Sequence, residues 1–375
     1  MSDKKLTIVM LVTKRQYRGA EISACNLSKA LIEKGHKVIW IGLYSNSSHD
    51  VVSIDGAVNI DLPNASGWLA YKKIKKLIAI FKEYKPDICQ ANGSDTLRYL
   101  VILKLFGYKT KLVYRNISII SKWVTSKPKY YLLRFLFSKT DKVVSVGDEA
   151  LYDFNKLFKF SKNKAQVIHR GIPLISANQS EVKEIKNKYS IGYDDFVFIH
   201  IGHFSGEKNH EFLIQVWQKL IEKHNTIKLV LLGDGSLREG ILEKVKQNNL
   251  SNSIIAPGLQ TNIADWLSIS KAMLLCSTVE GVPGVVVEAS FQGVPTIAVN
   301  VGGVKEVLID GENGLLVPKH DINLFVAQCE KLMLNKDYHQ KLATTAKTIV
   351  RNRFDLETNT NHFVDLYQSV LNNYK

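Results

Sequence analysis

The sequence is poor in cysteine, and its four cysteines form no recognisable pattern. They lie far apart in the 375 residues and include no Cys-x-x-Cys pair: Cys25, Cys89, Cys276 and Cys329. Zinc sites of that type and disulfide frameworks both need closer spacings. We therefore expect neither, and reduced thiols favour a cytoplasmic protein.

Long apolar runs are also missing. No stretch reaches the roughly 18–20 uninterrupted apolar residues of a membrane-spanning helix. The apolar run Leu6–Val12 is short and meets Lys14 and Arg15 without a small-residue cleavage site. It predicts a buried strand and not a signal peptide.

Acidic residues are scarce in the first half of the chain. Residues 1–180 carry 30 Lys and Arg against 13 Asp and Glu, a net charge of +17, whereas residues 181–375 have a net charge of −2. This asymmetry predicts that the first half meets an anionic partner. A membrane surface or a phosphorylated ligand fits. Nucleic acid is disfavoured, because no nucleic-acid-binding module is recognisable.

Length and periodicity predict two α/β domains. Strand Leu6–Val12, helix Ala20–Lys34 and strand Lys37–Leu43 form a β-α-β unit that is typical of a parallel sheet. Later strands are expected at Ile88–Ala91, Lys111–Tyr114, Lys142–Val146, Phe196–Ile201, Lys228–Leu232, Ser253–Ala256, Ala272–Cys276 and Thr296–Val299. The fold class is therefore α/β, with two doubly wound Rossmann-like domains.

The domain junction is expected in the polar stretch 174–195, which has no strong apolar period. We place the first domain at 1–172 and the second at 173–355. Apolar spacing in Asp355–Tyr374 predicts a last helix, about 356–375, that could pack back on the first domain.

Two carboxylates flank a Gly/Pro turn after the strand Ala272–Cys276. Glu280 would lie on the loop, and Glu288 would lie about one turn inside the following helix. The N–H groups of Gly284 and Val285 would then lie at the helix start, which favours phosphate binding. Nearby carboxylates can accept hydrogen bonds from sugar hydroxyls. An ordinary turn with a surface Glu and a capping Glu remains the alternative.

Two other strand–helix turns carry residues suited to phosphate. The loop that follows Phe196–Ile201 contains His203 and Lys208, and Gly19 precedes the first helix. A lysine can hold a diphosphate as a point charge, and a glycine lets a ligand approach the backbone. The alternatives are a polar loop with a solvated lysine and a simple turn glycine. Leu232–Gly235 is predicted to be a tight turn.

In their order along the chain, these segments resemble family 4 of the retaining, nucleotide-sugar-dependent glycosyltransferases, which have the GT-B fold of two domains facing across a cleft. The resemblance covers nearly the whole chain. It rests on segments Arg18–Val38, Val167–Ile172, Ile201–Asn209, Leu231–Gly235, Glu280–Glu288 and Gly293–Val317.

The resemblance implies roles for single residues. Glu280 would contact hydroxyls of the donor sugar, and Glu288 would hold the ribose hydroxyls. Gly284 and Val285 would donate backbone N–H groups to the donor. Lys208 would neutralise the diphosphate, and Gly19 would lie in the loop that closes on the phosphates. The first domain would bind the acceptor.

Two positions depart from the family pattern. His203 stands where relatives usually have Arg, and imidazole is a weaker, pH-dependent cation. Relatives often have a His near the reacting sugar, where this sequence has Arg115 or Asn116. The two departures put the usual catalytic pair in question and leave the fold unaffected.

Two basic segments are candidates for contact with an anionic membrane. Residues 68–82 form an amphipathic pattern with Ile74, Leu77, Ile78 and Phe81 on one face and lysines on the other; residues 122–134 mix aromatic and basic side chains. The alternative for the first segment is a helix whose apolar face packs into the core.

The sequence therefore predicts an enzyme, peripheral on the cytoplasmic side of the membrane, that transfers sugar from a nucleoside diphosphate sugar to a glycan or lipid-linked acceptor, with retention of configuration. It would act in surface polysaccharide biosynthesis, without a cofactor or a metal. A nucleotide-sugar epimerase with the GT-B fold and a non-catalytic module that binds anionic surfaces are the alternatives.

Overall fold

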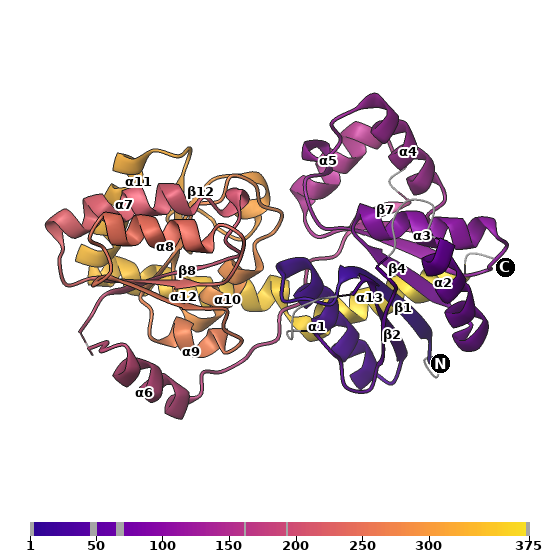
Figure 1. Cartoon of the computed structure of the whole chain (residues 1–375), viewed down its shortest axis with the longest axis horizontal. Helices are drawn as coiled ribbons and strands as arrows, with labels where there is room; N and C mark the ends of the chain where they lie inside the picture. The colour runs from indigo at the N-terminus through magenta and orange to yellow at the C-terminus, as the bar shows by residue number, and fades with distance from the viewer. Residues whose placement is uncertain (1–3, 46–50, 65–70, 161–162, 193, 373–375) are drawn as a thin grey trace. The chain divides into compact units, whose positions relative to one another are not determined.

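The chain folds into two α/β units, each built around a parallel sheet (Figure 1). The computed structural model describes residues 4–45, 51–64, 71–160, 163–192 and 194–372. Unit 1 comprises Met1–Pro173 and Phe354–Lys375, and unit 2 comprises Leu174–Arg353. The two doubly wound parallel sheets predicted from the sequence are confirmed.

Unit 1 contains a seven-stranded sheet in the order β3-β2-β1-β4-β5-β6-β7. Its central strands are apolar on both faces, as expected where helices cover a parallel sheet from both sides. The strands are β1 (Thr7–Lys14), β2 (Lys37–Tyr44), β3 (Val58–Asp61), β4 (Ile88–Asn92), β5 (Lys111–Asn116), β6 (Lys142–Ser145) and β7 (Ala165–Val167).

Helices cover both faces of this sheet (Figure 1). One face packs against α1 (Gly19–Glu33) and α13 (Leu356–Asn372), so the last helix of the chain belongs to unit 1. The other face packs against α2 (Tyr71–Tyr84), α3 (Ser94–Leu105), α4 (Lys127–Ser138) and α5 (Asp148–Phe158). Successive β1 side chains alternate between the two cores, as the strand period of two requires.

Unit 2 contains a six-stranded parallel sheet in the order β10-β9-β8-β11-β12-β13. The strands are β8 (Val197–Ile201), β9 (Lys228–Leu232), β10 (Ile254–Gly258), β11 (Ala272–Leu275), β12 (Thr296–Val299) and β13 (Gly314–Val317). The helices are α6 (Gln179–Lys188), α7 (His210–Lys223), α8 (Arg238–Gln247), α9 (Ile263–Ser268), α10 (Gly284–Gln292), α11 (Ile322–Leu334) and α12 (Lys336–Phe354).

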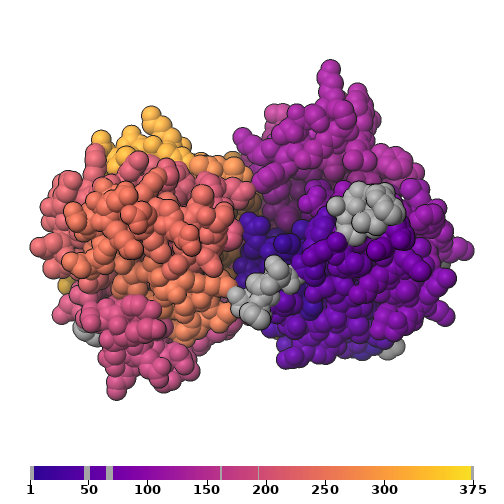
Figure 2. Space-filling view, in the orientation of Figure 1, coloured from indigo at the N-terminus to yellow at the C-terminus, as the bar shows by residue number. Residues whose placement is uncertain are grey.

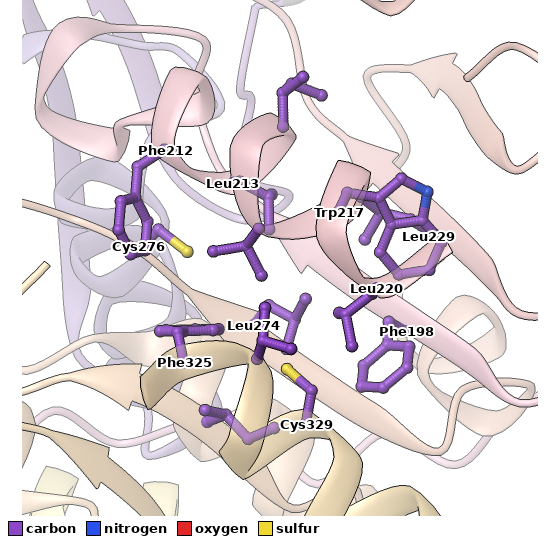
Figure 3. Close-up of a cluster of buried hydrophobic side chains, with 14 of the residues drawn as sticks. Phe198, Phe212, Leu213, Trp217, Leu220, Leu229, Leu274, Cys276, Phe325 and Cys329 are labelled. Carbon is purple, nitrogen blue, oxygen red and sulfur yellow. The ribbon is translucent and has the colours of Figure 1, made fainter. Parts of the chain in front are cut away.

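The core of unit 2 lies where α7 and α11 meet on the sheet (Figure 3). Leu213, Trp217 and Leu220 of α7 are fully or almost fully buried, and so are Phe325 and Cys329 of α11. This packing fixes the start of α7, and with it the loop that joins β8 to α7.

Several elements were missed by the sequence prediction. The polar stretch 174–195 contains α6, whose one buried residue is Ile185, so its apolar period is weak. Strands β3, β7 and β13 have only three or four residues each, too few for a clear alternation. The strand predicted at Ser253–Ala256 is displaced and corresponds to β10 (Ile254–Gly258). The helix predicted at Thr261–Ser270 is shorter and corresponds to α9 (Ile263–Ser268).

The two basic segments have different environments. In α2, Leu77 and Phe81 are buried in the core, with Ile74 and Ile78 packed against it. The apolar face of α2 is therefore not available to a membrane, and the packing alternative is confirmed. Residues 68–70 of that segment lie outside the described residues.

The second segment exposes apolar side chains in and next to α4. We define the α4 surface as Trp123, Tyr131, Leu132 and Phe135, which are 46%, 63%, 55% and 46% exposed, with the exposed cations Lys122, Lys127, Lys129 and Arg134. The purple and magenta part of unit 1 that contains α4 lies at the surface (Figure 2). Among the described helices, none has the length and apolar content to cross a bilayer.

Candidate active site

The topology of unit 2 predicts where a ligand binds. Strands β8 and β11 are neighbours in the sheet, and the order reverses between them, because the chain proceeds to β9 on one side and to β12 on the other. Ligands bind at the carboxyl ends of strands at such a switch point. The loops that leave these two strands contain Lys208 and Glu280.

Lys208 and Glu280 form an ion pair across this switch point. Lys208 ends a short 3-10 turn, η3 (Gly206–Lys208), and its Nζ lies 2.6 Å from Oε1 of Glu280. Their side chains are 21% and 9% exposed. The Ser277 hydroxyl donates to the same carboxylate oxygen at 2.5 Å. The structure thus brings together two of the residues that the sequence predicted, and adds a serine that it missed.

Backbone contacts hold the Glu280 loop in place. The N–H of Thr278 donates to the carbonyl of Glu207 at 2.8 Å, which ties the two loops together. A third loop, after β12, lies against Glu280, because the N–H of Gly303 donates to its carbonyl at 3.3 Å. Gly302 has φ +51°, and a Cβ there would lie 2.0 Å from the same carbonyl oxygen. Only glycine permits this approach.

Helix α10 begins directly after this loop. Gly284 and Val285 are its first two residues, whose N–H groups have no acceptor within the helix. Glu288 follows one turn later and is half-buried. The loop position of Glu280 and the helical position of Glu288 are therefore confirmed. A carboxylate, a cation and a helix N-terminus all occur in this small region.

His203 lies on the exposed side of the β8 loop. Gly235, in the turn after β9, approaches it closely: a Cβ at Gly235 would lie 2.9 Å from Cε1 of His203. Gly233 has φ +137° and packs on the carbonyl of Gly202. The tight turn predicted at Leu232–Gly235 comes slightly later in the structure, at Ser236–Leu237, where the N–H of Arg238 donates to the carbonyl of Gly235 at 3.0 Å. A role of His203 toward the diphosphate stays a prediction.

Two buried histidines lie behind the loop and were missed from the sequence. His200 on β8 and His210 at the start of α7 are 0% and 3% exposed, with ring centroids 4.7 Å apart. Burial lowers the pKa of His200 to about 4 and that of His210 to about 2. Both rings are neutral, therefore, and His210 also stacks on Phe204 at 4.0 Å. The position of His200 inside an apolar strand was the sequence signal from which its burial could have been predicted.

In unit 1, Gly19 is the first residue of α1 and is exposed. A Cβ at this position would meet no atom within 4 Å. The fold itself therefore does not require glycine here, whereas a ligand that approaches the backbone would.

Arg115 and Asn116 end β5 and point to opposite faces of the sheet. Arg115 reaches α1, where its Nη2 donates to Ser23 Oγ at 2.8 Å. Asn116 Nδ2 instead donates to Ser145 Oγ at 3.2 Å and to the Ala150 carbonyl at 3.1 Å. The two side chains therefore cannot fill the same place, and a catalytic role for either of them stays a prediction.

No three His, Cys, Asp or Glu side chains of the described residues are grouped to hold a metal ion. The expectation that the chain works without a metal stays a prediction.

Comparison with protein families identifies the chain. The model described as Glycosyltransferase Family 4 matches residues 17–175, and that described as Glycosyl transferases group 1 matches residues 181–349. The chain belongs to this glycosyltransferase family, as the order of its motifs predicted.

Curated relatives are similar at moderate identity. N-acetyl-alpha-D-glucosaminyl L-malate synthase of Bacillus anthracis is 28% identical over 244 residues, which cover 65% of this chain and 64% of the relative. The match thus spans less than two thirds of that protein. A Campylobacter jejuni protein is 25% identical over 73% of this chain and 78% of its own length; it is named N-acetylgalactosamine-N,N'-diacetylbacillosaminyl-diphospho-undecaprenol 4-alpha-N-acetylgalactosaminyltransferase.

Solved structures share the fold. Anabaena Alr3699/HepE in complex with UDP and glucose has a TM-score of 0.83 at 19% identity, over 97% of this chain and 100% of that one. WaaG, a glycosyltransferase involved in lipopolysaccharide biosynthesis, has a TM-score of 0.75 at 15% identity, over 96% and 99%. The likeness confirms the GT-B fold class.

Proposed function

We propose that the chain is a retaining glycosyltransferase that moves a sugar from a nucleoside diphosphate sugar to a glycan or lipid-linked saccharide. The proposal places it in the synthesis of a surface polysaccharide or related glycoconjugate. The family membership supports the reaction class, and the complex of the Anabaena protein with UDP and glucose supports a donor of this chemistry.

The observation that carries the proposal is the Lys208–Glu280 pair at the switch point of unit 2. A donor has a sugar, which offers hydroxyl groups, joined directly to an anionic diphosphate. A carboxylate and an ammonium group 2.6 Å apart match these two parts on either side of the bond that breaks. Lys208 would stabilise the departing diphosphate as its negative charge grows, and Glu280 would accept hydrogen bonds from the sugar.

The nucleotide would lie along α10. The N–H groups of Gly284 and Val285 would bind a phosphate or sugar oxygen, and Glu288 would accept hydrogen bonds from the ribose. Ser277 would keep the Glu280 carboxylate in place while Lys208 turns to the diphosphate. Unit 2 would therefore be the donor domain, and unit 1 would bind the acceptor. We propose no metal ion or cofactor for the reaction.

The α4 surface would attach the enzyme to the inner face of a membrane. Exposed apolar side chains in a group are uncommon on soluble proteins and mark interaction sites. The basic side chains beside them fit anionic lipid head groups. Such attachment would bring a lipid-linked acceptor to unit 1.

Thermal-shift screening of nucleoside diphosphate sugars tests the proposal. A donor at about 100 times its Kd stabilises the folded protein by about 2.7 kcal/mol, which would raise Tm by several degrees. The same donor should leave Glu288→Ala much less stabilised. Release of nucleotide should then depend on a saccharide acceptor, and NMR of the product should show the donor's anomeric configuration.

Other outcomes would contradict the proposal. If the chain interconverts the sugar of the donor without an acceptor, it is an epimerase. If no nucleoside diphosphate sugar raises Tm and none is cleaved, the transferase proposal is wrong.

A further inference from the structure

His200 on β8 has two ring nitrogens with different surroundings. Its Nδ1 lies 2.9 Å from the carbonyl oxygen of Leu274 on the neighbouring strand β11. A carbonyl oxygen only accepts hydrogen bonds, so Nδ1 carries the proton of the ring and donates it. Burial lowers the pKa of His200 to about 4, so the ring has no second proton at neutral pH. Nε2 is therefore left with a bare lone pair, which is a hydrogen-bond acceptor.

This acceptor is buried and has no hydrogen-bond partner among the described residues. A buried polar atom without a partner destabilises the folded state, so packing alone does not account for it. His210 at the start of α7 lies against the ring of His200, with their planes at 80°. On its other side His210 stacks on Phe204, which is 0% exposed. These two rings fix the orientation of His200 and separate it from solvent.

The lone pair of His200 lies beside the stem of Lys208. Gly202, directly after β8, is the point where they meet: a Cβ there would lie 3.2 Å from His200 Nε2, and 3.4 Å from Cγ and from Cδ of Lys208. Both side chains therefore border the same small space, which a side chain at residue 202 would fill. Because the ammonium group is joined to Cδ through one further carbon, rotation about the terminal torsions of the lysine turns Nζ toward Nε2.

In the structure the Lys208 ammonium group contacts Glu280 instead, with Nζ 2.6 Å from Oε1. An ammonium group has three N–H donors, and this contact uses one of them. In the proposed function Glu280 turns to hydroxyl groups of the donor sugar. Lys208 then loses this partner at the moment when its charge has to stay beside the diphosphate. An acceptor on the buried side of the lysine would hold it there.

We propose that His200 is a positioning residue for Lys208: its Nε2 accepts a hydrogen bond from the ammonium group and holds that group in place for the diphosphate while Glu280 binds the sugar. A second N–H of the ammonium group then donates to a phosphate oxygen. Because the ring is neutral, it orients the lysine without repelling its charge. The inference rests on the proposed function, since it assumes that Lys208 acts on a diphosphate.

Nuclear magnetic resonance of the full chain, labelled with the nitrogen-15 isotope at histidine, tests the hydrogen bond without a substrate. Glu280→Met removes the competing carboxylate and keeps an unbranched stem, so the lysine should turn to His200. The Nε2 signal of His200 should then move from its wild-type position in the direction of a hydrogen-bonded lone pair. Adding Lys208→Met should abolish this shift. His224, which contacts Glu330 elsewhere in unit 2, is the internal control, and its signals should not move.

Two conservative variants separate positioning from packing. The amide group of an asparagine superimposes on Nδ1, so His200→Asn keeps the bond to Leu274 and lacks the acceptor at Nε2. The amide group of a glutamine superimposes on Nε2, so His200→Gln offers its oxygen to Lys208 and gives up the bond to Leu274. His200→Asn should lower kcat about tenfold to a hundredfold with little change in donor KM, because a charged hydrogen bond is lost. His200→Gln should recover most of that turnover, whereas a role in packing alone predicts the opposite order.

Each measurement can overturn the proposal. An unmoved Nε2 signal in Glu280→Met, or the same shift in the chain that also lacks Lys208, would contradict the hydrogen bond. Turnover of His200→Asn equal to or above that of His200→Gln, with both chains folded by circular dichroism, would contradict the positioning role. The resonance experiment leaves His200 unchanged, so it decides the matter even if either variant unfolds. It also needs no donor: a shift in a chain that neither binds nor cleaves any nucleoside diphosphate sugar would support the contact between His200 and Lys208 and reject only the transferase proposal.

Discussion

Replacement of Lys208 by methionine separates two explanations of the site in unit 2. Methionine keeps an unbranched stem of similar length and removes the charge. In the structure, Lys208 contacts Glu280 directly, so the lysine has a structural partner as well as its proposed chemical role. Loss of the contact with Glu280 affects stability, and loss of the proposed chemical role affects turnover.

The geometry sets the size of each effect. The Glu280 side chain is 9% exposed beside Lys208, and without the lysine Ser277 is its remaining side-chain donor among the described residues. Loss of a charged hydrogen bond costs about 1.5–3 kcal/mol. For a unit of this size that lowers Tm by about 3–12 °C. Loss of a fixed charge that stabilises a leaving group lowers kcat about 100-fold to 1,000-fold.

The assay is a double-mutant cycle with Glu280→Gln, with kcat and donor KM measured for all four proteins. If Lys208 acts on the diphosphate, Lys208→Met should lower kcat about 100-fold in both backgrounds, with a smaller change in KM. Lys219→Met, on the exposed side of α7, controls for loss of a lysine from the same unit. If Lys208→Met lowers kcat only when Glu280 is present, the lysine merely anchors the glutamate, and the diphosphate role is wrong.

Three other substitutions test neighbouring parts of the same site. Glu288→Ala should weaken calorimetric binding of the free nucleotide by about 1.5–3 kcal/mol, because ribose hydroxyls lose a charged acceptor; equal affinity would reject the ribose role. His203→Arg should keep or raise turnover at alkaline pH, where a histidine is neutral and an arginine is charged. A pH–rate profile identical to that of the wild type would contradict the proposal that the charge of residue 203 assists the diphosphate. His200 and His210 bind protons less readily when folded, so their contribution to the free energy of unfolding is full above about pH 6.5 and is lost as the pH falls toward 4. In denaturant titrations His210→Phe should therefore lose less stability than the wild type between pH 7 and pH 5, and an equal loss would contradict the neutral, buried state of the ring.

The arrangement of strands was predictable because it rests on local signals. Continuous apolar runs such as Leu6–Val12 and Phe196–Ile201 mark buried parallel strands, and helix-like segments between them enforce parallel connections. The positions of Glu280 and Glu288 followed from the same logic, since a Gly/Pro turn after a buried strand leads into a helix. Short or exposed elements such as α6 and β3 gave no comparable signal.

Side-chain pairing was not predictable, because it depends on residues far apart in the chain. Lys208 and Glu280 are 72 residues apart and meet only because β8 and β11 are neighbours in the sheet. Lys73 is a stronger case: its place in a lysine-rich helix suggests solvent, yet it is 0% exposed, with Nζ 3.3 Å from the ring centroid of Tyr44. Burial and the charge of Arg98 lower its pKa to about 8. A count of charged residues treats Lys73 as a surface charge, whereas in the structure its side chain is buried and packs against Tyr44.

The basic side chains of unit 1 therefore lie in different environments, some buried and some exposed. Membrane binding by the α4 surface tests the role of an exposed group. Leu132→Ser with Phe135→Ser removes two side chains that are about half exposed, so each would gain roughly 1 kcal/mol on insertion into lipid. Binding to anionic vesicles should fall about tenfold or more, while Leu334→Ser, at a 70% exposed position on α11, should leave it unchanged. The exposed charges of this surface are screened by salt over about 8 Å at physiological ionic strength. Raising the salt concentration should therefore weaken vesicle binding. Co-sedimentation that is equal for anionic and neutral vesicles at low salt would refute the electrostatic part, and equal binding by the double variant would refute the apolar part.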